Sequence, residues 1–155
     1  MCTDRAAIVA PPPLLFAVCI IAGLGLTWLV PVELPRTARY IALPAGGAAL
    51  AAALGWAVPA WRIFIDRGTP LSPWKGATTL VTTGPYRFTR NPMYLALVLM
   101  TLGLGGVIAS VWLAGSAVVL WALLDVCVVR PEERFLRRRF GVDYENYRAI
   151  VRRWF

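Results

Sequence analysis

Apolar residues occur in four segments that are long enough, or nearly long enough, to cross a membrane as helices. Residues 14–32 and 40–61 carry no charged side chain, and a hydrocarbon core requires roughly 20 helical residues. Residues 93–108 and 111–129 follow further along the chain, and their only charge is Asp125. The pattern predicts an all-α polytopic membrane protein with about four transmembrane helices, of which the third is the shortest.

The third and fourth apolar segments are predicted to pair as a tight helical hairpin. Small residues mark the expected turn between them: Gly103, Gly105, Gly106 and Ser110. The first arm of this hairpin is shorter than a bilayer core. We therefore expect it to tilt little, to thin the bilayer or to enter it only partly.

Charged residues are concentrated in two segments, a loop at residues 62–92 and a tail at residues 130–155. The loop holds five basic residues against one acid, and the tail holds eight arginines against four acids. Because basic residues favour the cytoplasmic side of a membrane, both segments and the N-terminus are predicted to be cytoplasmic. Residues 1–13 show no clear cleavage pattern, so the first helix is predicted to be an anchor within a single domain of residues 1–155.

The composition supports a membrane protein and argues against several other classes. The chain is 59% hydrophobic with a mean hydropathy of +0.64, which is too apolar for an ordinary soluble domain. A net charge of +8 would suggest nucleic-acid binding in a soluble protein, but here the basic residues flank apolar spans, so no nucleic-acid partner is expected. The chain has no histidine, and Cys2, Cys19 and Cys127 lack metal-ligand spacing. We expect packed thiols, and neither a metal site nor a Ser/His/Asp triad.

The tail is predicted to fold into two amphipathic helices at the membrane interface. Pro131 suits the first position of a helix, where Glu132 and Glu133 would complement the helix dipole, and Gly141 would end it. Asp143 would then cap a second helix. Apolar and aromatic residues recur at helical spacing along that second helix: Tyr144, Tyr147, Ile150, Val151 and Trp154.

The segment GPYRFTRNPMY, residues 84–94, leads into the third apolar segment. Arg87 and Arg90 would form a cationic collar there, because arginine is costly inside a bilayer. Asn91 and Pro92 are typical of a helix start, whose free backbone N–H groups favour an anion. We therefore expect an anion-binding position at this helix start.

This motif, followed by an apolar hairpin and then by EERFLRRRFGVDYENYRAIVRR, resembles the membrane methyltransferase superfamily that contains isoprenylcysteine carboxyl methyltransferases and phospholipid methyltransferases. The resemblance covers residues 62–155. It implies S-adenosylmethionine as the methyl-donor cosubstrate without a metal, a site on the cytoplasmic side, and a lipid or lipid-tailed acceptor. It also implies Arg90 and Tyr94 as catalytic residues. The cofactor-binding residues that it implies are Asn91, Pro92, Tyr94, Glu132 and Glu133. Arg87 is added to them because either Arg87 or Arg90 would bind the anionic end of the cofactor as a fork.

The chain departs from the pattern of these families at several positions. The isoprenylcysteine enzymes usually read Arg-His-Pro where this chain has Asn91, which is closer to the Asn-Pro-Met-Tyr of phosphatidylethanolamine methyltransferases. Ala96 replaces a glycine that often lies two residues after the tyrosine, and Gly46 and Gly47 do not match the Gly-x-Gly spacing of the phospholipid enzymes. The acceptor is either a prenylcysteine-type carboxylate or a phospholipid-type amine, with a slight preference for a phospholipid or another non-prenylated molecule.

The chemistry of methyl transfer is compatible with a chain that lacks histidine. S-adenosylmethionine presents a carboxylate, an ammonium and a sulfonium, so its site requires cationic and acidic groups placed apart. Displacement at the sulfonium requires alignment and a dry site more than a proton shuttle. A carboxylate acceptor is already a nucleophile, whereas an ammonium must first lose a proton, to a glutamate, Asp125, a tyrosine or a lipid phosphate.

Each candidate residue also has a purely structural interpretation. Asn91 and Pro92 would merely cap a helix, and the arginines of the collar would contact lipid headgroups. Glu132 and Glu133 would complement the helix dipole and pair with Arg137. An aromatic belt at the interface would explain most of the remaining aromatic side chains: Tyr86, Tyr144, Tyr147 and Trp154.

Two further alternatives stay open at this point. Asp125 lies near the cytoplasmic end of its span, where it would either pair with an arginine or have a function of its own. The whole chain would, in the alternative to a methyltransferase, be a non-catalytic membrane subunit or a small transporter whose arginines bind lipid. That alternative predicts no affinity for S-adenosylmethionine. The sequence does not indicate an oligomeric state.

Overall fold

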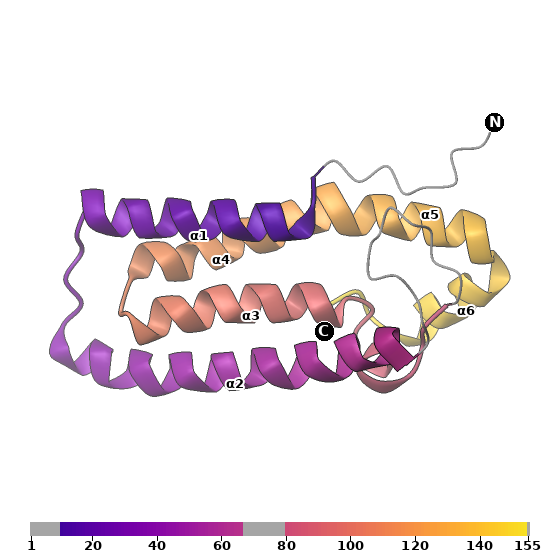
Figure 1. Ribbon diagram of the computed structural model, residues 1–155, viewed down its shortest axis with the longest axis horizontal. Helices are drawn as coiled ribbons and strands as arrows, with labels where there is room; N and C mark the ends of the chain where they lie inside the picture. The colour runs from indigo at the N-terminus through magenta and orange to yellow at the C-terminus, as the bar shows by residue number, and fades with distance from the viewer. Residues whose placement is uncertain (1–9, 67–79, 155) are drawn as a thin grey trace.

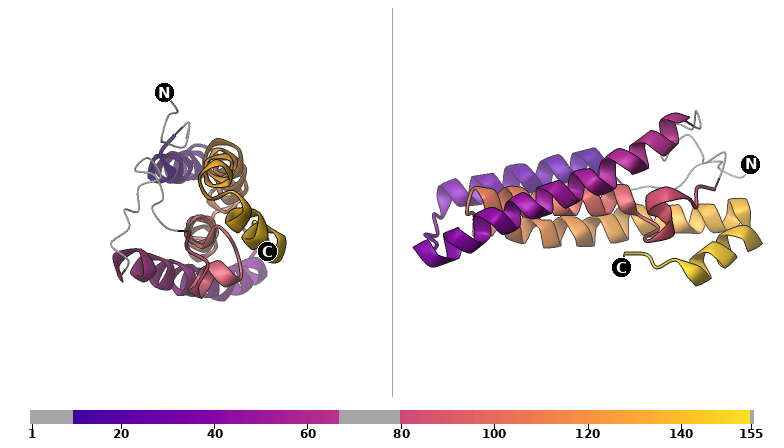
Figure 2. Two further views of the ribbon diagram at one scale, coloured as in Figure 1. Left: turned by 90° about the vertical axis from the view of Figure 1, so that its right-hand side faces the viewer. Right: turned by 90° about the horizontal axis from the view of Figure 1, so that it is seen from below.

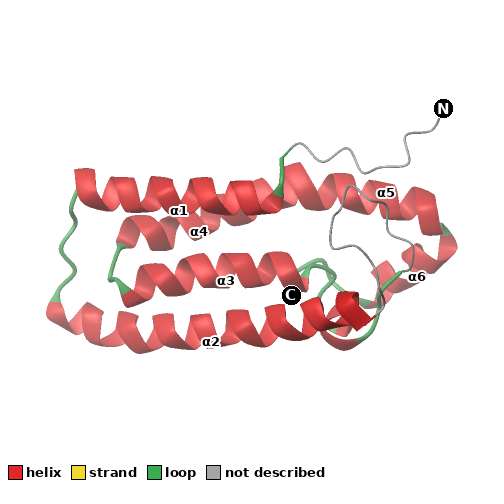
Figure 3. Ribbon diagram, in the orientation of Figure 1, coloured by secondary structure: helices red, strands yellow, loops and turns green. Residues whose placement is uncertain are grey.

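The computed structural model describes residues 10–66 and 80–154, and these ranges are helical without a strand (Figure 3). Cys2 and residues 67–79 of the predicted loop lie outside them. The all-α prediction is confirmed. The described elements are α1 Pro12–Leu29, α2 Arg36–Asp66, the 3₁₀ turn η2 Gly84–Arg87, α3 Pro92–Val107, α4 Val111–Leu124, the π turn η3 Asp125–Val129, α5 Arg130–Phe140 and α6 Val142–Ile150.

Three described helices are long and apolar enough to cross a membrane: Pro12–Leu29, Arg36–Ile63 and Val111–Phe140. The fourth, α3, has 16 residues, which is about 24 Å of helix against a hydrocarbon core of about 30 Å. Figures 1 and 2 show the helices side by side as a bundle, with α3 packed between α2 and α4. The prediction of a polytopic protein with a short third helix is therefore confirmed.

The outer surface of the bundle is apolar, as expected of helices whose solvent is lipid. Large aliphatic side chains such as Ile21 and Leu29 on α1 and Ile41 on α2 are exposed. A continuous apolar surface of this kind is rare on a soluble monomer. Trp28 and Tyr40 are exposed near the connection of α1 to α2, and aromatic side chains are common where a helix meets the membrane interface.

Glycines bring α2 and α3 into backbone contact. A Cβ atom at Gly46 would lie 2.7 Å from the carbonyl oxygen of Gly103, and one at Gly106 would lie 2.8 Å from the Cα atom of Gly46. A Cβ atom added at Gly105 would meet the backbone nitrogen of Ala114 in α4 even more closely. The three glycines that were predicted to form a turn therefore lie inside α3. Their absent side chains allow close helix packing, which is the main source of helix association in lipid.

The turn of the hairpin follows these glycines. Ala109 has a φ of 54°, and the Ser110 side chain caps α4 by accepting a hydrogen bond of 3.1 Å from the N–H of Leu113. Ser110 thus belongs to the turn as predicted. The helix continues through the glycines because irregular backbone at that depth would leave N–H and C=O groups without partners in the lipid.

The fourth span continues directly into the polar tail. α4, η3 and α5 form one helix from Val111 to Phe140, so the prediction that a new helix begins at Pro131 is wrong. The π turn explains how the helix passes the proline. The N–H of Arg130 bonds to the carbonyl of Asp125, five positions back, and Pro131, which has no N–H to donate, follows it.

The second helix of the tail reverses direction after α5. Gly141 ends α5 as predicted, and its φ of 52° permits the reversal. Gly141 also occupies the N-cap position of α6, and Asp143 lies inside the first turn. The predicted capping role of Asp143 is therefore wrong, because the tight reversal leaves no extended residue between the two helices.

The apolar residues of the tail do not all share one helix face. Tyr144, Tyr147 and Val151 are buried together against Leu80 and two residues of α5. Ile150, however, is 84% exposed, and α6 ends there. Beyond α6 the chain returns to the bundle, and residues 152–154 run beside the start of α3 (Figure 1). Trp154 lies on this returning segment and not on a second amphipathic helix.

Candidate active site

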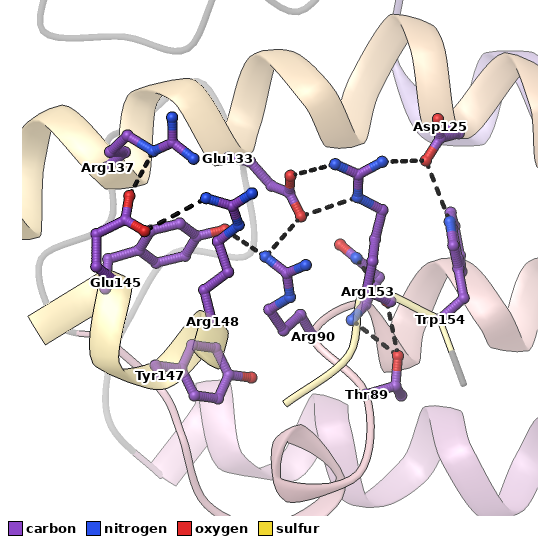
Figure 4. Close-up of polar contacts among 12 residues, drawn as sticks. Thr89, Arg90, Asp125, Glu133, Arg137, Glu145, Tyr147, Arg148, Arg153 and Trp154 are labelled. Carbon is purple, nitrogen blue, oxygen red and sulfur yellow. Dashed lines mark hydrogen bonds and ion pairs between the residues drawn. The ribbon is translucent and has the colours of Figure 1, made fainter. Parts of the chain in front are cut away.

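Polar side chains converge at one end of the bundle, where three segments of the chain meet (Figure 4). Arg90 comes from the residues that precede α3, and Glu133 comes from the first turn of α5. Asp125 begins the π turn, and Arg153 comes from the returning tail. The returning tail contacts both the GPYRFTRNPMY segment, through Thr89 and Asn91, and Glu133 of α5.

A buried ion pair joins the segment that precedes α3 to the first turn of α5. The Nη1 atom of Arg90 lies 2.8 Å from Oε1 of Glu133, and both side chains are largely buried, with 10% and 14% exposed. The same Nη1 atom lies 3.2 Å from the Tyr144 hydroxyl, to which it donates. The Nε atom of Arg90 is buried and has no hydrogen-bond partner among the described residues. A buried donor without a partner is costly, so it marks a place where an acceptor atom would be favourable.

Arg153 connects two carboxylates that lie on the long helix. Its Nη2 and Nε atoms lie 2.7 and 3.1 Å from the two carboxylate oxygens of Glu133, and its Nη1 atom lies 3.3 Å from Oδ1 of Asp125. Asp125 also accepts from Arg130 at 2.8 Å and from the indole N–H of Trp154 at 3.1 Å. The hydrogen bonds to Glu133 raise the pKa of the Arg153 guanidinium above its ordinary value, so this side chain stays charged.

The tail is held at the start of α3 by its backbone as well. The side-chain amide of Asn91 and the hydroxyl of Thr89 each donate a 3.0 Å hydrogen bond to the carbonyl of Arg153. The N–H of Arg90 donates to the carbonyl of Arg152 at 3.0 Å. Asn91 lies at the N-cap of α3 but makes no capping bond with its side chain. The interpretation of Asn91 as a side-chain cap is therefore wrong, because its amide is engaged by the tail.

Glu132 and Glu133 face different partners. The hydroxyl of Tyr94 donates a 2.9 Å hydrogen bond to Oε2 of Glu132, which joins α3 to α5 a second time. Arg137 pairs instead with Glu145 of α6 at 2.6 Å, on the exposed side of the tail. The structural interpretation in which Arg137 neutralises the glutamate pair is therefore wrong. Both glutamates are directed to the start of α3.

The remaining candidates divide between buried and exposed positions. Pro92 is buried at the first position of α3, whereas Arg87 is exposed at the end of η2 and lies apart from the network around Glu133. The structure thus brings together Arg90, Asn91, Pro92, Tyr94, Glu132 and Glu133, and it leaves Arg87 outside the cluster.

The aromatic-belt interpretation is wrong for the tyrosines of α6. Tyr144 is 1% exposed, and burial raises the pKa of its hydroxyl, so at neutral pH it remains protonated while it accepts the hydrogen bond from Arg90. Tyr147 is buried and donates to the carbonyl of Tyr86 at 2.7 Å. The ring of Trp154 packs at a tilt against that of Trp121, with 6.1 Å between the ring centroids, and its indole N–H donates to Asp125. These side chains hold the tail in place.

Sequence reasoning missed the contribution of the returning tail. Thr89, Arg152 and Arg153 were not predicted as parts of the site, and Trp154 was assigned to an interfacial belt. The one available signal was the density of arginines after α6, but a run of like charges does not reveal which guanidinium folds back onto a carboxylate.

The two described cysteines, Cys19 and Cys127, are packed in the apolar interior. Cys19 is buried, and Cys127 packs against the same apolar cluster of α1, α4 and the π turn. In the described part of the chain, no group of three His, Cys, Asp or Glu side chains is placed to hold a metal ion. The packing of the two described thiols agrees with the sequence interpretation.

The site combines the groups that a zwitterionic, cationic ligand such as S-adenosylmethionine requires. It offers an arginine with an unused donor beside an N-terminal helix end, which suits a carboxylate. It also offers two glutamates, which suit an ammonium or hydroxyl groups. Both lie at one end of an apolar bundle. The residues present therefore fit such a ligand.

Comparison with known proteins gives partial matches. The sequence model of the family described as phospholipid methyltransferase matches residues 41–143, from α2 to the start of α6. The nickel-cobalt-cadmium resistance protein NccN of Alcaligenes xylosoxydans xylosoxydans is 37% identical over 71 residues, which cover 46% of this chain and 33% of that protein. The cobalt-zinc-cadmium resistance protein CzcN of Cupriavidus metallidurans is 40% identical over 62 residues, which cover 40% of this chain and 29% of that protein. The chain thus spans about a third of the length of each relative. No solved structure matches the chain.

Proposed function

Because the chain belongs to the phospholipid methyltransferase family, we propose that it transfers a methyl group from S-adenosylmethionine to a lipophilic acceptor delivered by the membrane. The observation that carries this proposal is the double connection between α3 and α5, through Arg90 to Glu133 and through Tyr94 to Glu132. Buried charges at the end of a membrane bundle are costly, so an arrangement of this kind favours a functional site.

Different residues of the site would bind different chemical groups of the cofactor. Arg90 would donate from its unused Nε atom to the cofactor carboxylate, beside the N-terminal end of α3 that Asn91 and Pro92 form. Glu133 would accept from the cofactor ammonium or from its ribose hydroxyls. S-adenosylmethionine would supply an electrophilic methyl group on its sulfonium. The chain's own contribution would be alignment and exclusion of water.

Tyr94 and Glu132 would serve the acceptor. The Tyr94 hydroxyl donates a hydrogen bond to Glu132 near the start of α3, where it would align an incoming nucleophile. For an amine acceptor, Glu132 would take the proton that the nitrogen must lose before it attacks. For a carboxylate acceptor no proton need be removed. The two acceptor classes, a phospholipid-type amine and a prenylcysteine-type carboxylate, therefore place different demands on Glu132.

The acceptor would reach the site from the bilayer. The bundle presents apolar side chains outward over most of its length, and the described chain contains no separate domain that could bind a soluble substrate. Arg87 is exposed at the end of η2, three residues before Arg90, and would meet the phosphate or carboxylate of the acceptor at the interface. We further propose that this end of the bundle, with both termini, faces the cytoplasm, because the basic tail and the basic residues that precede α3 lie there.

The alternative is a non-catalytic membrane subunit or a small transporter with lipid-binding arginines. It predicts no affinity for S-adenosylmethionine, and no observed contact favours it over the methyltransferase. The two relatives are named as metal-resistance proteins. Among the described residues of this chain, no group of metal-ligating side chains is placed to hold a metal ion.

The test is methyl transfer from radiolabelled S-adenosylmethionine into a total lipid extract and, separately, into a prenylcysteine analogue, with the protein in detergent or liposomes. The label should enter one of the two lipid-tailed acceptors and not a short water-soluble acid or thiol. Absence of both cofactor binding and transfer in a folded protein would favour the non-catalytic alternative.

The variant Glu133→Gln tests the site within the same assay. It should weaken cofactor binding by roughly ten- to a hundredfold, because a charge-assisted hydrogen bond is lost. Glu145→Gln is the matched control, since Glu145 pairs with Arg137 and Arg148 on the exposed side of the tail. Equal affinities of the two variants for S-adenosylmethionine would mean that Glu133 has a structural role and does not bind the cofactor.

A further inference from the structure

Arg153 occupies the carboxylate that the proposed cofactor requires. Both oxygens of Glu133 accept from Arg153, and Oε1 also accepts from Arg90 at 2.8 Å. Three of the roughly four acceptor positions of this carboxylate are therefore used, and two guanidinium groups already neutralise its charge. A cofactor ammonium would gain little at Glu133 unless one arginine gives way. Arg90 is the more buried of the two, whereas the Arg153 side chain is 32% exposed.

Asp125 offers Arg153 a second carboxylate on the same face of the long helix. Asp125 and Glu133 are eight positions apart, and in a regular α-helix of about 100° per residue they would point about 80° away from each other. The π turn η3 lies between them and adds one residue to a turn, which reduces the difference to about 20°. The π turn thus explains why one guanidinium contacts both carboxylates.

The tail has anchors that do not involve Glu133. The carbonyl of Arg153 accepts from Thr89 and Asn91, and the indole of Trp154 donates to Asp125. The backbone around Arg153 can therefore remain docked while its side chain changes partner. Only the bidentate bond to Glu133 must break, and the contact with Asp125 is already formed at 3.3 Å.

We propose that Arg153 is an internal cation that occupies Glu133 in the cofactor-free protein and withdraws to Asp125 when the cofactor binds. Asp125 is then a positioning residue, which acts on the cofactor only through Arg153. This inference rests on the proposed function, because it takes Glu133 as a cofactor ligand. It assigns a role to the carboxylate of the fourth span and to the arginine of the tail, neither of which belongs to the predicted site.

A double-mutant cycle tests the proposal, with S-adenosylmethionine affinity measured by calorimetry on the full chain in detergent. Asp125→Asn should weaken binding roughly five- to tenfold, because Arg153 loses its alternative partner and stays on Glu133. Arg153→Gln should leave the affinity unchanged or raise it, because the competitor is removed. In the double variant Asp125→Asn has no further effect, since it acts only through Arg153.

Two additional variants make the result independent of folding defects. Arg148→Gln is the matched control, because Arg148 lies on the same tail but pairs with Glu145, and it should leave affinity unchanged. Arg153→Lys preserves the charge but not the fork that spans two carboxylates, so it should reduce the effect of Asp125→Asn even if Arg153→Gln unfolds. Thermal melting of each variant identifies those that are folded.

Several outcomes would overturn the proposal. A loss of affinity in folded Arg153→Gln or Arg153→Lys would mean that Arg153 binds the cofactor itself. An equal loss from Asp125→Asn with and without Arg153 would mean that Asp125 acts independently of it. If the wild-type protein does not bind S-adenosylmethionine at all, the proposed function fails. Binding without coupling between the two positions refutes this inference alone.

Discussion

The contact of α3 with α2 and the contact of α3 with α5 are made by opposite chemistry. Along α2, glycines allow the two backbones to touch, and a Cβ atom at Gly46 would lie 2.7 Å from a backbone oxygen of α3. At the start of α3, Arg90 and Tyr94 reach the two glutamates of α5. Close backbone packing already associates helices in lipid, whereas buried ion pairs rarely add net stability. The comparison teaches that close backbone packing is sufficient to associate the helices, so the buried polar contacts are better explained by function than by net stability.

The largest effect is expected for membrane topology, because each end of the bundle should be accessible from one side of the membrane only. A cysteine placed at the exposed Arg87, beside the site, should react with a membrane-impermeant maleimide only from the cytoplasmic side. A cysteine at Ile108, which is 49% exposed at the turn between α3 and α4, should react only from the opposite side. The cysteines at positions 2, 19 and 127 are first replaced by serine or alanine. Labelling of both positions from one side would refute the proposed topology.

The next largest effect is expected at the polar contact. Arg90→Ala should weaken cofactor binding by roughly ten- to a hundredfold and lower the methyl-transfer rate, because it removes the donor to Glu133 and the unused Nε atom. Removing one partner of a buried pair usually costs about 3–5 kcal/mol, but Arg153 still neutralises Glu133, so a smaller loss of stability is expected. Arg138→Ala, at an exposed position of α5, is the control. Normal affinity in folded Arg90→Ala would contradict the proposed role.

The smallest effect is expected at the glycine contact, and it should appear in stability and not in cofactor affinity. Gly46→Ala should destabilise the protein by about 1–3 kcal/mol, because the new methyl group meets the backbone of α3. Gly47→Ala is a matched neighbour with no atom within 4 Å of its added Cβ, and it should be neutral or gain about 0.5–1 kcal/mol from helix propensity. Thermal melting in one detergent measures both. Similar melting temperatures for the pair would remove the argument for close packing.

The spans were predictable because membrane helices follow a rule that acts on each segment separately. A bilayer demands a long apolar run in which every backbone group bonds within the helix. α1, α2 and the long helix from Val111 to Phe140 satisfy that rule without reference to one another. Gly141 was also predictable as the end of α5, because a positive φ is local to the residue. The Asn-Pro start of α3 and the glutamates of α5 could be proposed as site residues from the sequence because their motifs lie in short continuous stretches.

Errors arose where the meaning of a residue depends on what lies opposite it. Gly103 and Gly106 are turn formers by composition, but their place against Gly46 makes them packing residues inside a helix. Asn91 is a residue type that commonly caps helices, yet its side-chain amide donates a hydrogen bond to the carbonyl of Arg153. Pro131 is a residue type that commonly begins helices, yet the preceding π turn allows the helix to continue through it.

The order of the spans, the position of the basic segments and the residues at the start of α3 and α5 are therefore local properties, fixed by apolar length, charge and backbone preference. The pairing of those residues is not local. Whether Glu133 faces Arg90, Arg153 or Arg137 depends on the rotation that the π turn imposes on the long helix and on the reversal at Gly141, which carries the tail back to α3. Each candidate partner is an arginine of the same chemistry. Only their arrangement in space distinguishes them, because electrostatic attraction is decided by distance and burial and not by separation along the chain.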